Sequence, residues 1–199
     1  MGVIYFATGN AHKLAEVREI VQPLVPGLSD ILGMPSDLGE PVEDGVSFAE
    51  NAAIKARHVA DALGVPAMAD DSGLCVDVMG GAPGIFSARW AGRHGDDAAN
   101  LDLLLAQLAD VLPGNRGARF VCAAALALPS GEVMIEEGEM RGSLRFERAG
   151  SNGFGYDPIF EPEGFTVTNA ELTPTQKNAI SHRRKAFEKL AAHIPGVLG

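Results

Sequence analysis

Two adjacent carboxylates, Asp70 and Asp71, constrain the fold of this chain more than any other feature of its sequence. They lie between two apolar runs that are typical of strands, Val65–Ala69 and Leu74–Val78. Like charges about 4 Å apart repel by about 1 kcal/mol in water, and by about 4 kcal/mol at an effective dielectric near 20. A fold that keeps both groups ionised therefore supplies a cation, several N–H donors or open water.

Two readings of this pair of aspartates follow. In an extended segment neighbouring side chains point to opposite faces, so one carboxylate could support the fold while the other faces a cleft. The alternative is a pair of turn residues that bond nearby N–H groups.

The N-terminal segment predicts a strand over Val3–Ala7, a tight turn and a helix. Asn10 is a suitable N-cap, and Gly9 lets the backbone approach a ligand at the helix N-terminus, where free N–H groups favour anions. Lys13 lies in the first turn, where a cation is unfavourable for the helix dipole. The turn is thus either a phosphate cradle or an ordinary capped turn with a solvated lysine. The apolar face of this helix is predicted to contain Leu14, Val17, Val21 and Leu24.

The later segments predict a mixed α/β fold. Ser47 and Glu50 have the spacing of a capping box before an alanine-rich helix that ends near Gly64. Two long strand-like runs, Ala118–Leu128 and Val133–Leu144, predict a β-hairpin. Asp96, Thr173 and Ser181 are the predicted caps of three further helices, with Phe187, Leu190 and Ile194 of the last one facing inward. No linker interrupts the pattern, so residues 1–199 are expected to form a single domain.

Acidic side chains outside the strands indicate a possible metal site. Glu43 lies in a polar loop and is either a ligand or a solvated carboxylate, whereas Glu50 has a sufficient role in the capping box. Because the candidate ligands are hard oxygens and no Cys/His cluster is present, the expected metal is Mg²⁺ rather than zinc.

A glycine-rich loop and a basic set complete the candidate chemistry. The loop GSNGFGYDP contains Phe154, which can stack on a base, and Asp157, which can accept hydrogen bonds from one. The basic set Lys177, His182 and Arg183 is either a solvated face or a group of hydrogen-bond donors; Arg184 and Lys185 are interpreted as surface residues. A phosphate cradle, an acidic site, a stacking loop and cationic donors together are typical of a nucleoside triphosphate site.

The net charge of −10 argues against binding of nucleic acids or anionic membranes, because the summed field repels polyanions. The two cysteines, Cys75 and Cys122, lie in apolar runs and are expected to be buried free thiols of a reducing compartment. The N-terminus lacks the basic region of a signal peptide, and no segment has the ~20 apolar residues of a membrane span. We therefore expect a soluble cytoplasmic protein.

Six motifs of the chain, ATGNAHK, FAENAAIKA, ADDSGL, GGAPGIFSARW, GFGYDPIF and AISHR, resemble the inosine triphosphate pyrophosphatase family, also called Ham1-like. The resemblance extends from Ala7 to Arg183, with the motifs in the family order. It implies an elongated α/β fold with a mixed sheet, flanking helices and two lobes around a central nucleotide-binding cleft, usually in a homodimer. It also implies Mg²⁺-dependent hydrolysis of the non-canonical purine nucleotides ITP, dITP and XTP to the monophosphate and pyrophosphate.

The resemblance also assigns residue roles. Glu43 and Asp71 would bind the metal, with Asp71 placed to activate the water, and Lys55 and Lys13 would neutralise phosphate charge. Glu43 is matched through its position before the G-x-S-F segment, in a loop that reads PVEDG here. The phosphates would be held by Thr8, Gly9, Asn10 and Lys13, and the nucleotide and its base by Ser72, Phe154, Gly155, Tyr156, Asp157, Lys177, His182 and Arg183.

The sequence disfavours three other classes of protein. The Maf-like pyrophosphatases share a related fold, but their arginine-rich signature after the first strand is replaced here by TGN-x-x-K. A nucleotide sensor without turnover is disfavoured by the intact Asp70-Asp71 pair together with Lys13. A nucleic-acid-binding protein is disfavoured by the net charge.

Overall fold

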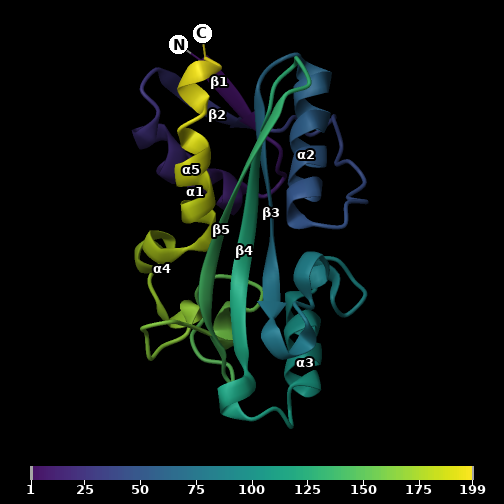
Figure 1. The fold of residues 1–199 in the computed structure, drawn as a ribbon, viewed down its shortest axis with the longest axis vertical. Helices are drawn as coiled ribbons and strands as arrows, with labels where there is room; N and C mark the ends of the chain where they lie inside the picture. The colour runs from purple at the N-terminus through teal and green to yellow at the C-terminus, as the bar shows by residue number, and fades with distance from the viewer. Residues whose placement is uncertain (1, 199) are drawn as a thin grey trace. The chain divides into compact units, whose positions relative to one another are not determined.

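The computed structural model describes residues 2–198, which form a six-stranded sheet with flanking helices (Figure 1). The strand order is β2-β1-β3-β4-β5-β6. β1 pairs in parallel with β2 and β3, whereas β5 and β6 are antiparallel, so the predicted mixed sheet is confirmed. The strands are β1 Gly2–Phe6, β2 Leu28–Gly33, β3 Ala67–Val76, β4 Gly117–Ala127, β5 Val133–Leu144 and β6 Phe160–Pro162; the α-helices are α1 Ala11–Val21, α2 Phe48–Leu63, α3 Asp97–Gln107, α4 Pro174–Ile180 and α5 His182–Ala191.

The chain divides into two compact units, which are described separately. Unit 1 comprises Met1–Asp71, Cys122–Gly138 and His182–Gly199, and unit 2 comprises Ser72–Val121 and Glu139–Ser181. The strands β3, β4 and β5 contribute residues to both units.

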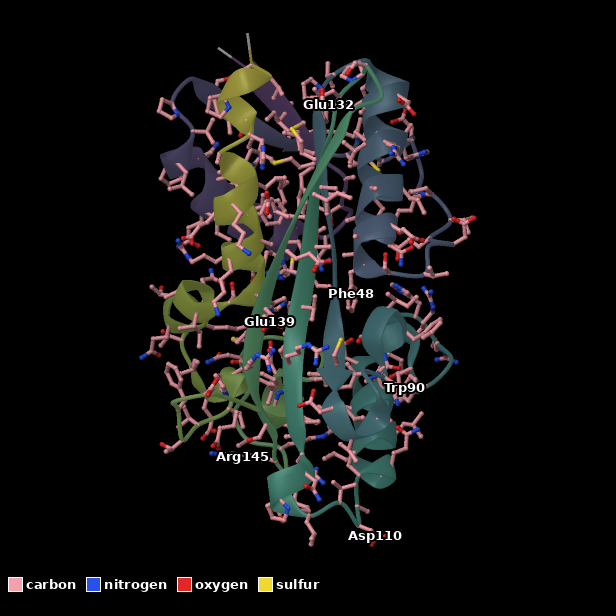
Figure 2. The ribbon with its side chains drawn as sticks, in the orientation of Figure 1. Phe48, Trp90, Asp110, Glu132, Glu139 and Arg145 are labelled. Carbon is pink, nitrogen blue, oxygen red and sulfur yellow. The ribbon has the colours of Figure 1, made fainter. Side chains whose placement is uncertain are left out.

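Unit 1 has an apolar cluster on each side of its strands. α1 and α5, which lie side by side in Figure 1, bury Val17, Ile20 and Phe187 in one cluster with Phe6 of β1. α2 presents small residues such as Ala52 and Ala56 to the other cluster. Phe48, labelled at the N-terminal end of α2 in Figure 2, packs against this second cluster. Helices on both sides thus fix the strand segment that ends at Asp71.

Local side-chain bonds explain where the helices of unit 1 begin. Asn10 caps α1 as predicted, because its Oδ1 accepts hydrogen bonds from the backbone N–H groups of His12 and Lys13. Ser47 caps α2 and accepts a bond from the N–H of Glu50. The Glu50 carboxylate accepts a bond from Val46 N at 2.9 Å, one residue before the N-cap, so its predicted structural role is confirmed in a slightly different form.

Unit 2 has its own core, in which Leu74, Leu104, Tyr156 and Phe160 are buried. Arg116 is 1% exposed, and its guanidinium donates to three backbone carbonyl oxygens, among them that of Leu108 at the end of α3. In Figure 2 Trp90 lies beside α3, where its Nε1 donates to Gln107 Oε1 at 2.8 Å. Asp96 and Thr173 cap α3 and α4 as predicted.

Three details differ from the prediction. The strand β2, Leu28–Gly33, was not predicted, and the two runs around the aspartates are one continuous strand, β3. Leu24 was expected on the buried face of α1 but is 46% exposed, because α1 ends at Val21 and a 3₁₀ turn follows.

The predicted burial of single apolar residues and of the two thiols agrees with the structure. Phe187, Leu190 and Ile194 are buried, and Cys75 and Cys122 are buried free thiols. Within residues 2–198, no helix combines the length and apolar character needed to cross a membrane.

Candidate active site

The two aspartates lie in the middle of β3, and the strand continues through them. Their contacts follow the alternation of side chains along a strand, since Asp70 bonds to residues of α1 and α5 and Asp71 bonds to residues of α2. The alternative that the pair consists of turn residues is therefore wrong. The prediction that neighbouring carboxylates serve opposite faces is confirmed.

Asp70 is 3% exposed and binds two cations. Lys13 Nζ lies 3.2 and 3.3 Å from its two oxygens, and Nε and Nη2 of Arg183 both lie 3.2 Å from Oδ2. Arg183 Nη1 also contacts Glu16 Oε2 at 2.5 Å. Burial opposes the guanidinium charge, but the carboxylates of Asp70 and Glu16 raise the pKa of Arg183 above its ordinary value. These contacts give Asp70 a role in supporting the fold.

The turn before α1 explains the position of Lys13. Thr8 Oγ1 accepts a bond from Asn10 N at 3.1 Å, and the Asn10 cap holds the first turn of the helix. Gly9 lies close to the polar loop, because a Cβ at this position would be 3.4 Å from Glu40 Oε1. Lys13 was expected to face an anion, and in this structure the anion is the carboxylate of Asp70. The Lys13 side chain is still partly exposed, with 22% of its surface accessible.

Asp71 contacts a different set of side chains on α2. Lys55 Nζ lies 3.3 Å from Asp71 Oδ1 and 2.9 Å from Glu43 Oε1, and Asn51 Nδ2 donates to Asp71 Oδ2 at 3.2 Å. Burial raises the pKa of Asp71 above its ordinary value, and Glu43 and Asp70 add to the rise, although Lys55 and the Asn51 bond oppose it. For Lys55, burial lowers the pKa, but the three carboxylates outweigh it and the pKa is raised.

Glu43 and Asp71 were predicted to be metal ligands, and one ammonium, that of Lys55, contacts both carboxylates. In the part of the chain from residue 2 to residue 198, no group of three or more His, Cys, Asp or Glu side chains is arranged to hold a metal ion. Mg²⁺ usually binds through one or two carboxylates and completes its shell with water and substrate phosphates. Two carboxylates brought together at one cation position fit that chemistry, and they do not fit a site built from protein ligands alone.

In unit 2, Asp157 holds the glycine-rich loop around Phe154. Asp157 is 3% exposed, and its carboxylate accepts bonds from Lys177 Nζ at 2.5 Å, Asn169 Nδ2 at 3.0 Å and Phe154 N at 3.0 Å. Lys177 Nζ also lies 4.9 Å from the centroid of the Phe154 ring, which is 46% exposed. Gly153, with φ +75°, allows this approach, because a Cβ there would be 2.1 Å from Asp157 Oδ2.

Two other predicted binding residues of unit 2 have structural contacts. Gly155 N donates to Asp97 Oδ2 at 3.0 Å. Tyr156 lies in the core, and its hydroxyl donates to the carbonyl oxygen of Ser87 at 2.9 Å. Burial raises the pKa of Tyr156 well above its ordinary value, and the charge of Asp97 adds to the rise.

The predicted site residues thus fall into two sets. Unit 1 holds Thr8, Gly9, Asn10, Lys13, Glu43, Lys55, Asp71, His182 and Arg183, and unit 2 holds Ser72, Phe154, Gly155, Tyr156, Asp157 and Lys177. Of the two residues not yet placed, Ser72 is half-buried on β3, and His182 is buried at the start of α5.

Three residues that form hydrogen bonds with predicted site residues were not predicted from the sequence. Glu16 bonds to Arg183, Asn51 bonds to Asp71, and Asn169 bonds to Asp157. Asn51 lies four residues before Lys55, one helical turn away, and this spacing was the available signal.

Comparison with solved structures places the fold in a defined class. A HAM1 protein from Coxiella burnetii superposes with a TM-score of 0.88 at 40% identity, covering 98% of this chain and 100% of that one. The Ham1 protein of Staphylococcus aureus gives a TM-score of 0.86 at 37% identity, covering 98% of this chain and 99% of that one. The chain therefore has the fold of the Ham1 proteins.

Sequence comparison identifies the family. The model of the Ham1 family matches residues 4–193, and the chain belongs to this family. Proteins named dITP/XTP pyrophosphatase from Streptomyces avermitilis and Streptomyces coelicolor are each 57% identical to it, over 98% of this chain and 98% of their own length. The resemblance stated from the motifs is thereby confirmed.

Proposed function

We propose that the chain hydrolyses the non-canonical purine nucleoside triphosphates ITP, dITP and XTP to the nucleoside monophosphate and pyrophosphate. Relatives with 57% identity are named for action on dITP and XTP. The observation that carries the proposal is the position of Asp71, a partly buried carboxylate beside Glu43 with one shared ammonium, that of Lys55.

The charge balance of unit 1 favours a cation at this position. Around the aspartate pair, three cations face four carboxylates: Lys13, Lys55 and Arg183 against Glu16, Glu43, Asp70 and Asp71. A triphosphate adds further negative charge, which these cations alone do not offset. We therefore propose Mg²⁺ as cofactor, with Glu43 and Asp71 as its protein ligands. When bound, Mg²⁺ would neutralise phosphate charge and lower the pKa of a bound water.

The residues of the chain would then contribute proton transfer and positioning. Asp71 would accept the proton of the water that attacks the α-phosphorus, and pyrophosphate would leave. Lys13 and Lys55 would stabilise the charge of the leaving pyrophosphate. The N-terminus of α1, with Thr8, Gly9 and Asn10, would hold the phosphates through backbone N–H groups and the helix dipole.

Base recognition is proposed for the other predicted binding residues. Phe154 offers an exposed ring for stacking, and Asp157 and Lys177 are fixed next to it. A 6-oxo purine presents an acceptor to donors such as Lys177, His182 or Arg183, whereas the 6-amino group of adenine leaves such donors unpaired, a mismatch that can cost on the order of 10⁴-fold. The set proposed to contact the nucleotide is completed by Ser72, Gly155 and Tyr156.

The expected oligomeric state and cellular compartment follow from the family resemblance and from the cysteines. We expect a homodimer, which sedimentation equilibrium would reveal. The two free cysteines agree with a reducing, cytoplasmic location.

The proposal is tested by measuring pyrophosphate release with ITP, XTP, dITP, GTP and ATP, with Mg²⁺ and with a chelator in its place. We expect turnover of the first three nucleotides, at least about 100-fold lower kcat/KM for ATP and GTP, and loss of all turnover without the divalent ion. Equal rates for all five nucleotides would contradict the proposed specificity. Nucleotide binding without pyrophosphate release would instead identify a sensor.

A further inference from the structure

Asn51, on α2, links the Asp71 carboxylate to the loop that carries Glu43. Its Nδ2 donates to Asp71 Oδ2 at 3.2 Å, and its Oδ1 accepts from the backbone N–H of Gly45 at 3.0 Å. Gly45 follows Glu43 by two residues in the loop. One side chain therefore bonds to a proposed ligand on β3 and to the segment that bears the other ligand.

The asparagine side chain is well suited to this position. A carboxylate can only accept a hydrogen bond and a backbone N–H can only donate one, so the bridging group must offer a donor and an acceptor together. Asn51 is 0% exposed, and replacing its side chain by Ala removes both bonds at once, so Asp71 keeps only the Lys55 contact and Gly45 N loses its acceptor.

Gly45 packs closely against Asn51. A Cβ at Gly45 would lie 2.6 Å from Asn51 Oδ1, 2.7 Å from Glu50 Cβ and 3.0 Å from Asn51 N. These distances are too short for a side chain at residue 45, so any such side chain would displace the loop. The loop position thus depends on the Asn51 amide and on the absence of a side chain at Gly45.

We infer that Asn51 is a positioning residue that fixes the orientation of Asp71 and the position of the Glu43 loop, and thereby sets the geometry of the divalent-cation site. This inference rests on the proposed function, which assigns the cation to Glu43 and Asp71. Asn51 acts through its two partners and does not itself bind the ion. Side chains that hold metal ligands typically change metal affinity or activity by 10–100-fold when they are removed.

The test compares Asn51→Ala with Asn100→Ala. Asn100, in unit 2, is also buried, and its amide also makes two hydrogen bonds, with the backbone of Ala88 and Ala91. Mn²⁺ binding is measured by electron paramagnetic resonance in the presence of a non-hydrolysable α,β-methylene analogue of ITP. Steady-state kcat and KM with ITP and the melting temperature are measured on the same samples.

We expect Asn51→Ala to weaken Mn²⁺ binding about 10–100-fold and to lower kcat by a similar factor, with KM changed less than about threefold. Asn100→Ala should lower the melting temperature but keep Mn²⁺ affinity and kcat within about twofold. If Asn51→Ala also keeps both within twofold while it loses thermal stability, Asn51 is only a packing residue and the inference is wrong.

A second pair of variants tests the same inference should Asn51→Ala fail to fold. Gly45→Ala pushes the loop away from Asn51, whereas the control Gly114→Ala meets nothing within 4 Å. We expect weaker Mn²⁺ binding in Gly45→Ala only, and equal affinity in the two variants would overturn the inference. A wild-type protein that binds Mn²⁺ but does not hydrolyse ITP, XTP or dITP would refute the proposed function and leave the role of Asn51 to be decided by the Mn²⁺ data.

Discussion

Asp71 and Asp70 are chemically identical residues with different surroundings. Asp70 is 3% exposed and bonds to Lys13 and Arg183, so removing its charge would leave a buried guanidinium with fewer partners. Asp71 shares the ammonium of Lys55 with Glu43, and burial raises its pKa. At the residue scale, these contacts make Asp71 the better candidate for catalysis and Asp70 the better candidate for stability.

We expect Asp71→Asn to lower kcat by about 10²–10⁴-fold, because the variant loses the proposed proton acceptor and metal ligand. Its fold and much of its nucleotide binding should persist, since Lys55 keeps Glu43 as a counter-ion. Pyrophosphate release, circular dichroism and calorimetric nucleotide binding would check this. Asp77→Asn, which removes an exposed partner of Arg119 in unit 2, is the matched control and should retain full activity. Unchanged ITP hydrolysis in Asp71→Asn would exclude Asp71 from the mechanism.

Tyr156 permits a prediction about stability at high pH. Its folded-state pKa is raised by burial, so the folded state holds the phenolic proton more tightly than the unfolded state. The contribution of Tyr156 to stability is therefore complete below pH 10 and decreases as the pH rises above that value.

The variant Tyr156→Phe isolates this effect. It should lose about 1 kcal/mol of unfolding free energy at pH 7, because its hydrogen bond to Ser87 is missing. Between pH 10 and 11 its stability should decrease less steeply than that of the wild type. Urea unfolding at each pH measures both effects, and parallel curves would contradict the prediction.

At the scale of elements, α5 packs unusually close to β5. A Cβ at Gly138 of β5 would lie 2.3 Å from the carbonyl oxygen of His182 and 2.6 Å from Ala186 N. The first turn of α5 carries both His182 and Arg183, so this glycine allows the turn to approach β3 closely enough for Arg183 to bond Asp70.

Gly138→Ala should therefore displace the first turn of α5. We expect a loss of about 1–3 kcal/mol, which corresponds to a decrease in melting temperature of about 2–12 °C for a chain of this size. Turnover of ITP should fall as well, because Arg183 moves. Gly196→Ala, where a Cβ meets nothing within 4 Å, is the control for the melting temperature. Equal melting temperatures in both variants would show that α5 adjusts without cost.

The helix starts could be predicted from the sequence, whereas one strand, β2, could not. Helix starts were predictable because a cap is local: Asn10, Ser47 and Asp96 bond to N–H groups two or three residues ahead. β2 was missed because its sequence, LSDILG, has polar residues and glycine, and its strand form depends on parallel pairing with β1. Tertiary pairing of this kind has no local pattern.

The sequence could predict which residues belong to the candidate site, but it could not predict which side chains bond to them. A turn at Asp70 and Asp71, one of the two readings that the sequence left open, does not exist, because the strand continues through them. Cations from three helices elsewhere in the sequence bond to the two carboxylates within that strand. Asn51 and Glu16 were overlooked for the same reason: their roles follow from contacts with residues 20 and 167 positions away.

At the scale of the whole molecule, the net charge of −10 limits the partners of the chain. Lys13, Lys55 and Arg183, which are the cations around the aspartates, are all paired with carboxylates, so they form no open basic surface. A long polyanion would meet repulsion over most of the protein, whereas a small nucleotide with a metal ion would not.

We therefore expect no binding of single-stranded or duplex DNA between 50 and 150 mM salt. Fluorescence anisotropy with labelled oligonucleotides measures this, and ITP with Mg²⁺ serves as the positive control for an active preparation. Binding that weakens steeply with added salt would reveal a phosphate-contacting surface and contradict the prediction.

The alternation of side chains along β3 limits which insertions and deletions the chain can tolerate. Which aspartate meets α2 and which meets α1 and α5 depends on whether its position in the strand is odd or even. One codon gained or lost between the start of β3 and Asp70 would exchange the two carboxylates in a single event. Insertions and deletions of single residues should therefore be tolerated only in the loops.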